Sequence, residues 1–203
     1  MNKLYTIGHS NHDFGRFIQL LQMHGITALG DVRSSPYSRF NPQYNREHLQ
    51  KILKENHIAY VFLGNDLGPR SDDPSCYEAG KVQYARLAKT EAFLRGTERL
   101  LLGMKSYRIA LMCAEKDPIS CHRMILVCRV LRSEPVEIHH ILEDGRIESL
   151  RASEMRLMQE LKMRQLRLFE NPTDLIQRAY DTQGERIAYV RDEESIQEDG
   201  TQD

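Results

Sequence analysis

Residues 4–33 read LYTIGHSNHDFGRFIQLLQMHGITALGDVR, and this stretch decides the fold. The apolar run LYTIG at 4–8 has the length of a buried strand. The segment DFGRFIQLLQMHG at 13–25 spaces its apolar residues as a helix does and is closed by Gly25. A second strand-like run, ITALGDVR, occupies 26–33. Strand, helix and strand in this order predict a βαβ unit.

The same alternation continues along the chain. Strands alternating with helices predict right-handed crossovers and a mainly parallel sheet covered on both faces. We therefore expect a Rossmann-like, three-layer α/β fold with a mainly parallel five-stranded sheet. The segments behind this prediction are a polar loop (34–45), a helix (46–56), a strand (58–64), a loop (64–80), helical material (81–104), a strand (107–114), a helix (118–134) and a fifth strand (136–142).

The C-terminal part is expected to extend this domain. Asp144-Gly145 suits a type I′ hairpin turn, and an amphipathic helix is predicted over 152–165. We divide the chain into an α/β domain (1–150), a helical extension (151–180) and an acidic tail (181–203). The tail holds 2 basic and 8 acidic residues, which is typical of a solvated, flexible segment.

Composition excludes several classes of protein. A chain of 203 residues with 40% hydrophobic content can bury one substantial core. It has no apolar run of about 18 residues, and its first residues, MNKLYTIGHS, lack the pattern of a secretory signal. We therefore expect a cytoplasmic protein with no membrane partner, whose four cysteines remain thiols. The net charge of −1 is not the broad basic field that drives nonspecific binding to DNA.

Polar clusters follow four of the predicted strands. They are 9–11, 31–39, 64–70 and 113–115. Parallel strands end at one edge of a sheet, and ligands bind in the crevice beyond that edge. The sequence therefore predicts one functional site built from four loops.

These clusters carry a family resemblance. TIGHSN (6–11), DVRSSPYSRFNPQYN (31–45), LGNDLG (63–68) and CAEKDPISCHR (113–123) resemble the successive signatures of the family called domain of unknown function 488, over roughly residues 3–142. The family name carries no established activity. Its third loop usually reads Leu-Gly-Gly, whereas this chain has Gly64-Asn65-Asp66-Leu67-Gly68, so the geometry of that loop is expected to differ.

Four residues are candidates for catalysis: His9, Asp31, Glu115 and Cys121. Cys121 is predicted in the first turn of a helix, where the helix dipole and a neighbouring cation favour a thiolate nucleophile. An imidazole such as His9 can carry protons near neutral pH. Two structural alternatives stay open, because Cys121 can be a small buried hydrophobe and Asp31 can form an ion pair with Arg33.

The arginines of these loops point to an anionic substrate. A guanidinium presents a fixed fork of donors to phosphate, and Arg70 shares this character. The residues predicted to bind substrate are Ser10, Asn11, Arg33, Arg39, Asn41, Cys113, His122 and Arg123. As alternatives, Ser10 and Asn11 can cap the next helix, and Cys113 can be a core residue, as Cys128 is expected to be. Tyr37, Phe40 and Tyr44 can stack on a base or pack their loop onto the sheet.

The sequence names no cofactor, and we assign no metal ligand from it. A zinc site made from Cys113, Cys121, His122 and His9 is an alternative, but these residues lack the paired spacing of structural zinc sites. A thiol-redox role for Cys113 and Cys121 is a further alternative. The absence of a C-x-x-C pair counts against it.

A second, short resemblance lies outside the α/β domain. Gln165-Leu166-Arg167-Leu168-Phe169 is similar to the pentapeptide with which bacterial repair and replication proteins bind the sliding clamp. We expect Gln165, Leu166, Leu168 and Phe169 to make that contact, although Arg167 departs from the usual pattern. Alternatively, the apolar residues are the end of a docked amphipathic helix.

The leading hypothesis is an enzyme that acts on a phosphate-bearing substrate, a nucleotide or a nucleic acid, by hydrolysis or group transfer. The alternative is a non-catalytic module that binds nucleic acid or nucleotide and is tethered to DNA replication or repair machinery. Substitution of His9 and Cys121 separates the two hypotheses, since only the enzyme needs them.

Overall fold

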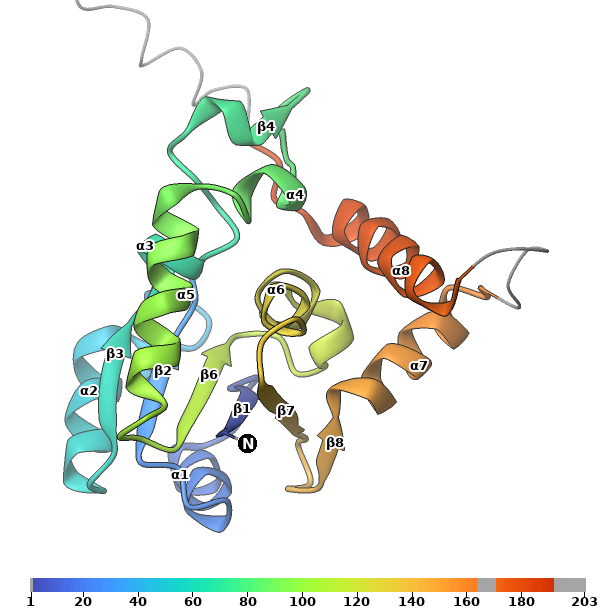
Figure 1. The fold of residues 1–203 in the computed structure, drawn as a ribbon. Coiled ribbons are helices and arrows are strands. Elements are labelled where there is room, and N and C mark those ends of the chain that lie inside the picture. The colour runs from blue at the N-terminus through green and yellow to red at the C-terminus, as the bar shows by residue number, and fades with distance from the viewer. Residues whose placement is uncertain (1, 164–170, 192–203) are drawn as a thin grey trace, which may run out of the picture.

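The computed structural model describes residues 2–163 and 171–191. It consists of one large sheet with helices on both faces and a small two-stranded hairpin (Figure 1). The strands are β1 (Asn2–Gly8), β2 (Ala28–Asp31), β3 (Ala59–Phe62), β4 (Tyr77–Glu78), β5 (Lys81–Val82), β6 (Ile109–Cys113), β7 (Val136–Ile141) and β8 (Ile147–Ser149). The helices are α1 (Phe14–Met23), α2 (Arg46–Glu55), α3 (Gly64–Leu67), α4 (Tyr84–Leu87), α5 (Glu91–Gly103), α6 (Arg129–Leu131), α7 (Leu150–Glu160) and α8 (Pro172–Ile187).

The large sheet has the strand order β3-β2-β6-β1-β7-β8. Its first five strands are parallel, and β8 pairs antiparallel with β7. Crossover helices on both faces bury the inner strands β2, β6 and most of β1, which explains why these read as continuous apolar runs, whereas the edge strand β3 is only partly buried. The predicted Rossmann-like α/β fold is confirmed, with the C-terminal hairpin adding a sixth strand to the five that were expected.

Alternate residues of each strand enter two separate cores. In β6, Ala110 and Met112 pack with α1 and α2, whereas Ile109, Leu111 and Cys113 face α5 and the helix that follows β6. Figure 1 shows these helices on opposite faces of the sheet. Because side chains of a strand alternate between faces, this register decides which residues Cys113 can meet.

The segment after β6 differs from the predicted single helix over 118–134. A 3₁₀ turn covers Pro118–Ser120, Cys121 is extended, and a π-helix over Arg123–Cys128 leads into α6. Asp117 caps the 3₁₀ turn through the backbone N–H of Ile119, which interrupts the helix before it reaches Cys121. The π stretch RMILVC has no sequence signature, because α- and π-helices share local preferences and differ only in hydrogen-bond register.

Three further local predictions are wrong. The β7–β8 turn is not of type I′, because Gly145 alone has a positive φ of 89° and Gly145 N–H donates to the Leu142 carbonyl. This is a type I turn with a glycine bulge. The helix predicted over 152–165 ends at Glu160, since Lys162 adopts a left-handed φ of 54°. The material expected to be helical at 81–104 begins with strand β5.

The C-terminal extension packs onto the domain rather than standing apart from it. Asn171 caps α8 and Pro172 takes the first helical position, so this pair begins a helix that runs to Ile187. Tyr180 is buried and its hydroxyl donates to Glu154 Oε1 at 2.9 Å. Helix α8 continues through residues 181–187 of the segment that we assigned to the acidic tail. The clamp-like peptide at 165–169 and residues 192–203 lie outside the described residues.

No helix of residues 2–163 or 171–191 has both the length and the apolar character needed to cross a bilayer.

Candidate functional site

The polar loops at the carboxyl ends of β1, β2, β3 and β6 enclose one crevice of about 290 Å³. Two glycines let the loops approach one another. A Cβ on Gly8 would lie 2.0 Å from the Glu115 carbonyl oxygen, and one on Gly64 would lie 1.9 Å from that of Arg33. The crevice is lined by His9, Arg33, Ser34, Ser35, Tyr37, Ser38, Asn41, Pro69, Arg70, Cys113, Ala114, Glu115 and His122.

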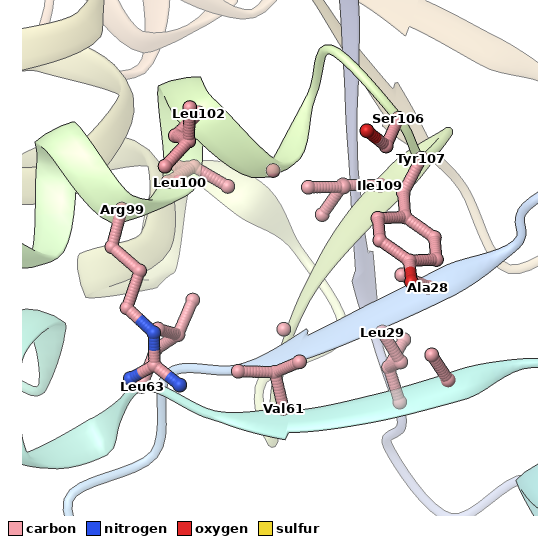
Figure 2. A pocket seen from close by; sticks show the side chains of 13 residues that line it. Ala28, Leu29, Val61, Leu63, Arg99, Leu100, Leu102, Ser106, Tyr107 and Ile109 are labelled. Atoms are coloured by element: carbon pink, nitrogen blue, oxygen red, sulfur yellow. The ribbon is translucent and has the colours of Figure 1, made fainter.

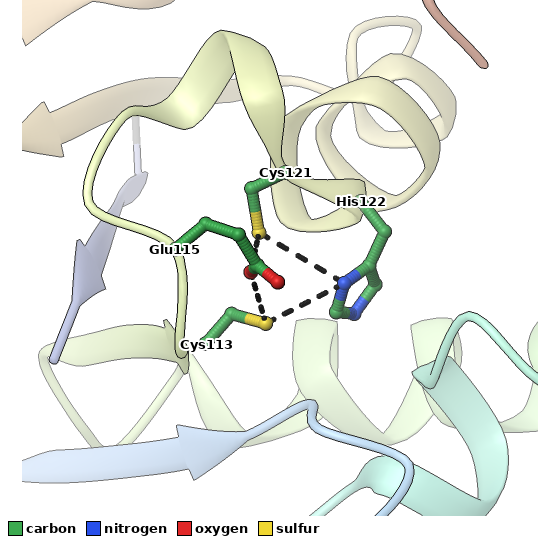
Figure 3. A group of neighbouring side chains, drawn as sticks. All are labelled: Cys113, Glu115, Cys121 and His122. Carbon is green, nitrogen blue, oxygen red and sulfur yellow. Dashed lines mark hydrogen bonds between the residues drawn. The ribbon is translucent and has the colours of Figure 1, made fainter. Parts of the chain in front are cut away.

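Four side chains converge at the base of this crevice, as Figure 3 shows. Cys113 Sγ and Cys121 Sγ each lie 2.9 Å from Glu115 Oε2. His122 Nδ1 lies 3.5 Å from Cys113 Sγ and 3.9 Å from Cys121 Sγ. The two sulfurs, the carboxylate oxygen and the ring nitrogen all lie within 4.8 Å of one another. We call these four residues the thiol cluster.

His122 has a defined tautomer in this arrangement. Its Nε2 lies 2.9 Å from the Val32 carbonyl oxygen, which can only accept a hydrogen bond. Nε2 therefore carries the proton, and the Nδ1 lone pair faces the two sulfurs. Val32 follows strand β2, so the loop after β2 orients a ligand-like nitrogen on the helix after β6.

Cys121 is extended and lies just before the helix, not in its first turn as predicted. Its carbonyl accepts from Ile125 N–H, and its Sγ accepts from Arg123 N–H at 3.4 Å. Burial opposes ionisation, but hydrogen bonding with Cys113 and the charge of Arg123 lower the pKa of Cys121 well below its ordinary value. Burial raises the pKa of Cys113 and, with the neighbouring thiolate, that of Glu115. Of the two thiols, Cys121 is thus the one whose surroundings favour the ionised form.

Arg123 does not point into the crevice, contrary to its predicted role in binding substrate. Its side chain is fully buried, and its terminal nitrogens donate to the carbonyls of Glu115 (2.6 Å) and Lys116 (3.0 Å). It therefore holds the loop that carries Glu115 and supplies positive charge behind the thiols. Gln183 of α8 supports the same loop by donating to the Ile119 carbonyl at 2.9 Å.

Asp31 and Arg33 form a buried ion pair, which was one of the two roles considered for Asp31 from the sequence. Asp31 accepts from Arg33 Nε at 2.9 Å and from Arg33 Nη2 at 2.6 Å, and it also accepts from the Arg33 backbone N–H at 3.1 Å and the Tyr60 hydroxyl at 2.9 Å. Arg33 Nη2 also donates to the Tyr44 carbonyl. Asp31 is fully buried behind the crevice wall, while Arg33 lines the crevice. Asp31 thus orients Arg33 and lies too deep to exchange protons with a ligand.

His9 occupies the wall beside the thiol cluster. Its Nδ1 lies 2.8 Å from the Ser10 carbonyl oxygen, its ring stacks on Tyr44 with centroids 4.2 Å apart, and its buried Nε2 has no partner among the described residues. Burial and the charge of Arg33 lower its pKa to about 4. His9 is therefore neutral at physiological pH, with a free acceptor nitrogen.

Ser10 and Asn11 are not helix caps. The cap of α1 is Asp13, which accepts from Arg16 N–H. Ser10 has a left-handed φ of 49°, and its hydroxyl donates to Asn11 Oδ1. Neither Ser10 nor Asn11 is among the described residues that line the crevice. A non-glycine residue in this strained conformation is typical of functional sites, and the sequence does not reveal that Ser10 adopts it.

The loop after β2 contributes unevenly. Asn41 lines the crevice as predicted, but Arg39 is exposed outside it, and Phe40 is 93% exposed. Arg70, in contrast, lines the crevice and lies 4.0 Å from the centre of the Tyr189 ring. Ser34, Ser35 and Ser38 also line the crevice; they lie within the polar segment 31–39, but nothing in the sequence distinguishes them as site residues. Nothing in the sequence indicates that Tyr189 contacts Arg70.

A second pocket, of about 340 Å³, lies between α5 and the strands β2 and β3 (Figure 2). Its walls are mostly apolar, with Leu63, Leu100 and Leu102 around Val61. Among the described residues that line this pocket, Arg99 is the only one with a charged side chain. Without converging polar groups it offers a ligand no orientation, so the crevice is the candidate functional site.

Comparisons with known proteins agree with the resemblance seen in the sequence. The model of the family "Domain of unknown function DUF488" matches residues 13–130, more than half of the chain. The match includes the thiol cluster and Arg33 but begins after His9. No curated protein and no solved structure matches the chain. The chain belongs to the DUF488 family.

Proposed function

We propose that this protein is an enzyme that acts on a phosphate-bearing substrate, a nucleotide or a nucleic acid, by hydrolysis or group transfer in the crevice. One observation carries the proposal: guanidinium groups, which are able to bind phosphate, and groups able to move protons line one crevice at the strand ends. We also propose that the reaction takes place in the cytoplasm.

The anion-binding side of the crevice is formed by Arg33, Arg70 and the serine hydroxyls between them. Asp31 holds Arg33 by two hydrogen bonds, so its guanidinium is preorganised. The guanidinium of Arg70 lies over the Tyr189 ring, and the backbone N–H of Arg70 donates to Ser34 Oγ at 3.2 Å. Fixed guanidinium groups bind phosphate without losing further conformational entropy.

The reactive side is formed by Glu115 and His9. Glu115 has a pKa raised above that of an ordinary carboxyl, and the residue lines the crevice, so it is a candidate for donating or accepting a proton there. His9 presents an unprotonated Nε2. Cys121 is the thiolate candidate for nucleophilic attack, although its side chain is almost fully buried behind Glu115.

The first experiment compares two arginines from neighbouring loops. Binding of nucleoside phosphates to the parent, Arg70→Ala and Arg39→Ala is measured by calorimetry, with Arg151→Ala of α7 as an exposed control. Arg70→Ala should weaken binding by about tenfold or more, because a charged hydrogen bond is worth about 1.5–3 kcal/mol. Arg39→Ala and Arg151→Ala should bind as the parent does. Equal affinity of all four proteins refutes the proposed phosphate site.

Turnover is then measured with the phosphate-bearing compounds that bind. His9→Gln and Cys121→Ser should each lower the turnover number while the melting temperature stays close to that of the parent. Unchanged turnover in both variants excludes them from the reaction.

The second candidate is the non-catalytic nucleic-acid module, and one observation favours it. Phe40 (93% exposed) and Tyr37 (53% exposed) flank Arg39 on one exposed loop, as in surfaces on which single-stranded bases stack. In that case Phe40→Ala weakens oligonucleotide binding but not nucleotide binding. Tethering to the sliding clamp through residues 165–169 remains part of this candidate, and a clamp titration against the Leu168→Ala, Phe169→Ala double variant tests it.

A further inference from the structure

The thiol cluster has more hydrogen-bond acceptors than its own protons can satisfy. If both thiols donate to Glu115 Oε2, the Nδ1 lone pair of His122 has no donor from the cluster. If one thiol turns to Nδ1 instead, the carboxylate loses a donor. Protein side chains that converge in this way, with lone pairs facing one centre, are the usual ligands of a metal ion.

We propose that Cys113, Cys121 and His122 bind one Zn²⁺ ion, leaving a fourth position that faces Glu115 and the crevice. This goes beyond the proposed function, since metal binding needs no substrate. In this proposal Cys121 is a zinc ligand and no longer a candidate nucleophile.

The distances select these three ligands. A tetrahedral zinc ion with bonds of about 2.3 Å to sulfur and 2.05 Å to nitrogen places the two ligand atoms about 3.6 Å apart. The Sγ–Nδ1 distances of 3.5 and 3.9 Å match that edge. The Sγ–Oε2 distances of 2.9 Å are too short for two atoms bound to one zinc ion and correspond to hydrogen bonds. Zinc binding replaces the thiol protons, so the Glu115 carboxylate must then move away from the two sulfurs.

Burial separates the same residues. Cys113, Cys121 and His122 are 3%, 1% and 4% exposed, whereas Glu115 is exposed at the crevice. Three buried ligands and one open position are the arrangement of catalytic zinc sites, in which water takes the fourth position. An adjacent carboxylate is then placed to exchange a proton with that water.

The surroundings of the site also fit a zinc ion. His122 donates through Nε2 to the Val32 carbonyl, which is the usual way in which a ligating histidine is oriented. Cys121 Sγ accepts the Arg123 N–H, and the Arg123 guanidinium lies behind the loop that carries Glu115. Two thiolates and an imidazole select zinc over magnesium and calcium, which prefer oxygen ligands. His9 lies outside this set, which corrects the ligand group considered from the sequence.

The test uses the full-length protein, freed of metal with a chelator and kept reduced. Zn²⁺ is titrated in competition with a chromophoric chelator, and Co²⁺ replaces Zn²⁺ for absorption spectroscopy. We expect one ion per chain, a thiolate-to-cobalt charge-transfer band and the strong visible bands of four-coordinate cobalt. A cobalt spectrum without the thiolate band, or no binding by the parent, overturns the proposal whatever the variants do.

Variants then assign the ligands. Cys113→Ser, Cys121→Ser and His122→Gln should each weaken Zn²⁺ binding by at least about 100-fold. Cys128→Ala, a buried cysteine of the π-helix, and His9→Gln are matched controls that should bind zinc as the parent does. Glu115→Gln should keep the charge-transfer band and the zinc affinity. Equal zinc affinity of Cys121→Ser and Cys128→Ala contradicts the assignment, and loss of zinc in Glu115→Gln contradicts the open fourth position.

The two proposals fail separately. Zinc binding with no affinity for any phosphate-bearing compound removes the proposed function and leaves the metal site. Phosphate binding and turnover by a protein that never binds zinc removes the metal site and returns Cys121 to the list of nucleophiles.

Discussion

The crevice at the strand ends and the apolar pocket under α5 have similar volumes, about 290 and 340 Å³, but opposite chemistry. In the crevice, buried polar groups are held in place by hydrogen bonds between different loops. In the apolar pocket, the walls are mostly apolar side chains such as Leu100. The size of a cavity therefore says little about function, and converging polar groups say much more.

The two regions also differ in what maintains them. The crevice depends on the buried ion pair of Asp31 and Arg33. Such pairs contribute little net stability but are costly to break on one side only. The apolar pocket depends on burial of hydrocarbon, which tolerates small changes. Substitutions in the two regions should therefore have separable effects on activity and on stability.

The largest effect is expected from Glu115→Gln, on the basis of the proposed function. The amide keeps the shape of the side chain but cannot transfer a proton, so turnover should fall by about 10²- to 10⁴-fold with little change in KM. Leu100→Ala, in the wall of the apolar pocket, should keep the turnover of the parent per folded molecule. Steady-state kinetics on both proteins measures this, and an equal loss in both would remove the distinction between the regions.

The next effect is on the free energy of unfolding, measured by urea denaturation. Asp31→Asn should lower it by about 3–5 kcal/mol, because the buried Arg33 guanidinium loses its counter-charge. Leu100→Ala should cost about 2–5 kcal/mol through a cavity. Only Asp31→Asn should also weaken phosphate binding. The double variant Asp31→Asn, Arg33→Met should recover part of the stability, and additive losses would show that the two residues do not act as a pair.

A third effect depends on pH. His9 has a pKa of about 4 in the folded protein and about 6.5 when unfolded, so between these values only the unfolded state binds the proton. Stability should therefore fall as pH falls from about 6.5 to about 4, by about 3 kcal/mol from this residue. His9→Gln should flatten the decline in thermal or urea melts across that window. Parallel pH profiles of the parent and His9→Gln would contradict the burial of a neutral imidazole.

The smallest effect is expected at the rim of the apolar pocket. Leu102 is 64% exposed, so Leu102→Ser should change the free energy of unfolding by less than about 0.5 kcal/mol. Nucleotide affinity and turnover should equal those of the parent. A clear loss of either in Leu102→Ser would mean that the apolar pocket takes part in function after all.

Much of this architecture was predictable from the sequence because it depends on local periodicity. The apolar runs before Gly8, Asp31 and Cys113 identify parallel strands. Because these strands run in the same direction, the loops that follow them lie at one edge of the sheet. His9, Arg33, Cys113, Glu115 and His122 were predicted at one site for this reason, and the crevice brings them together.

Other features were not predictable because they depend on contacts between distant segments. Arg123 carries the same charge in the sequence whether it faces a substrate or holds the backbone of Glu115. Tyr189 lies far along the chain from Arg70, and pairing of the segment after α8 with β5 brings its ring there. Asn171-Pro172 can end one helix or begin another, and burial of Tyr180 favours the second outcome.

The sequence by itself determined the α/β fold, the edge of the sheet that carries the site and the residue types gathered there, because strand period and loop polarity are local properties. Only the tertiary structure decided which of those residues face the crevice and which stand behind it. The physical reason is that a buried polar side chain points toward whichever partner satisfies it. Asp31 and Arg123 find their partners, Arg33 and the Glu115 carbonyl, in the same stretch of chain. The Val32 carbonyl that orients His122 lies 90 residues away and is brought near by folding alone.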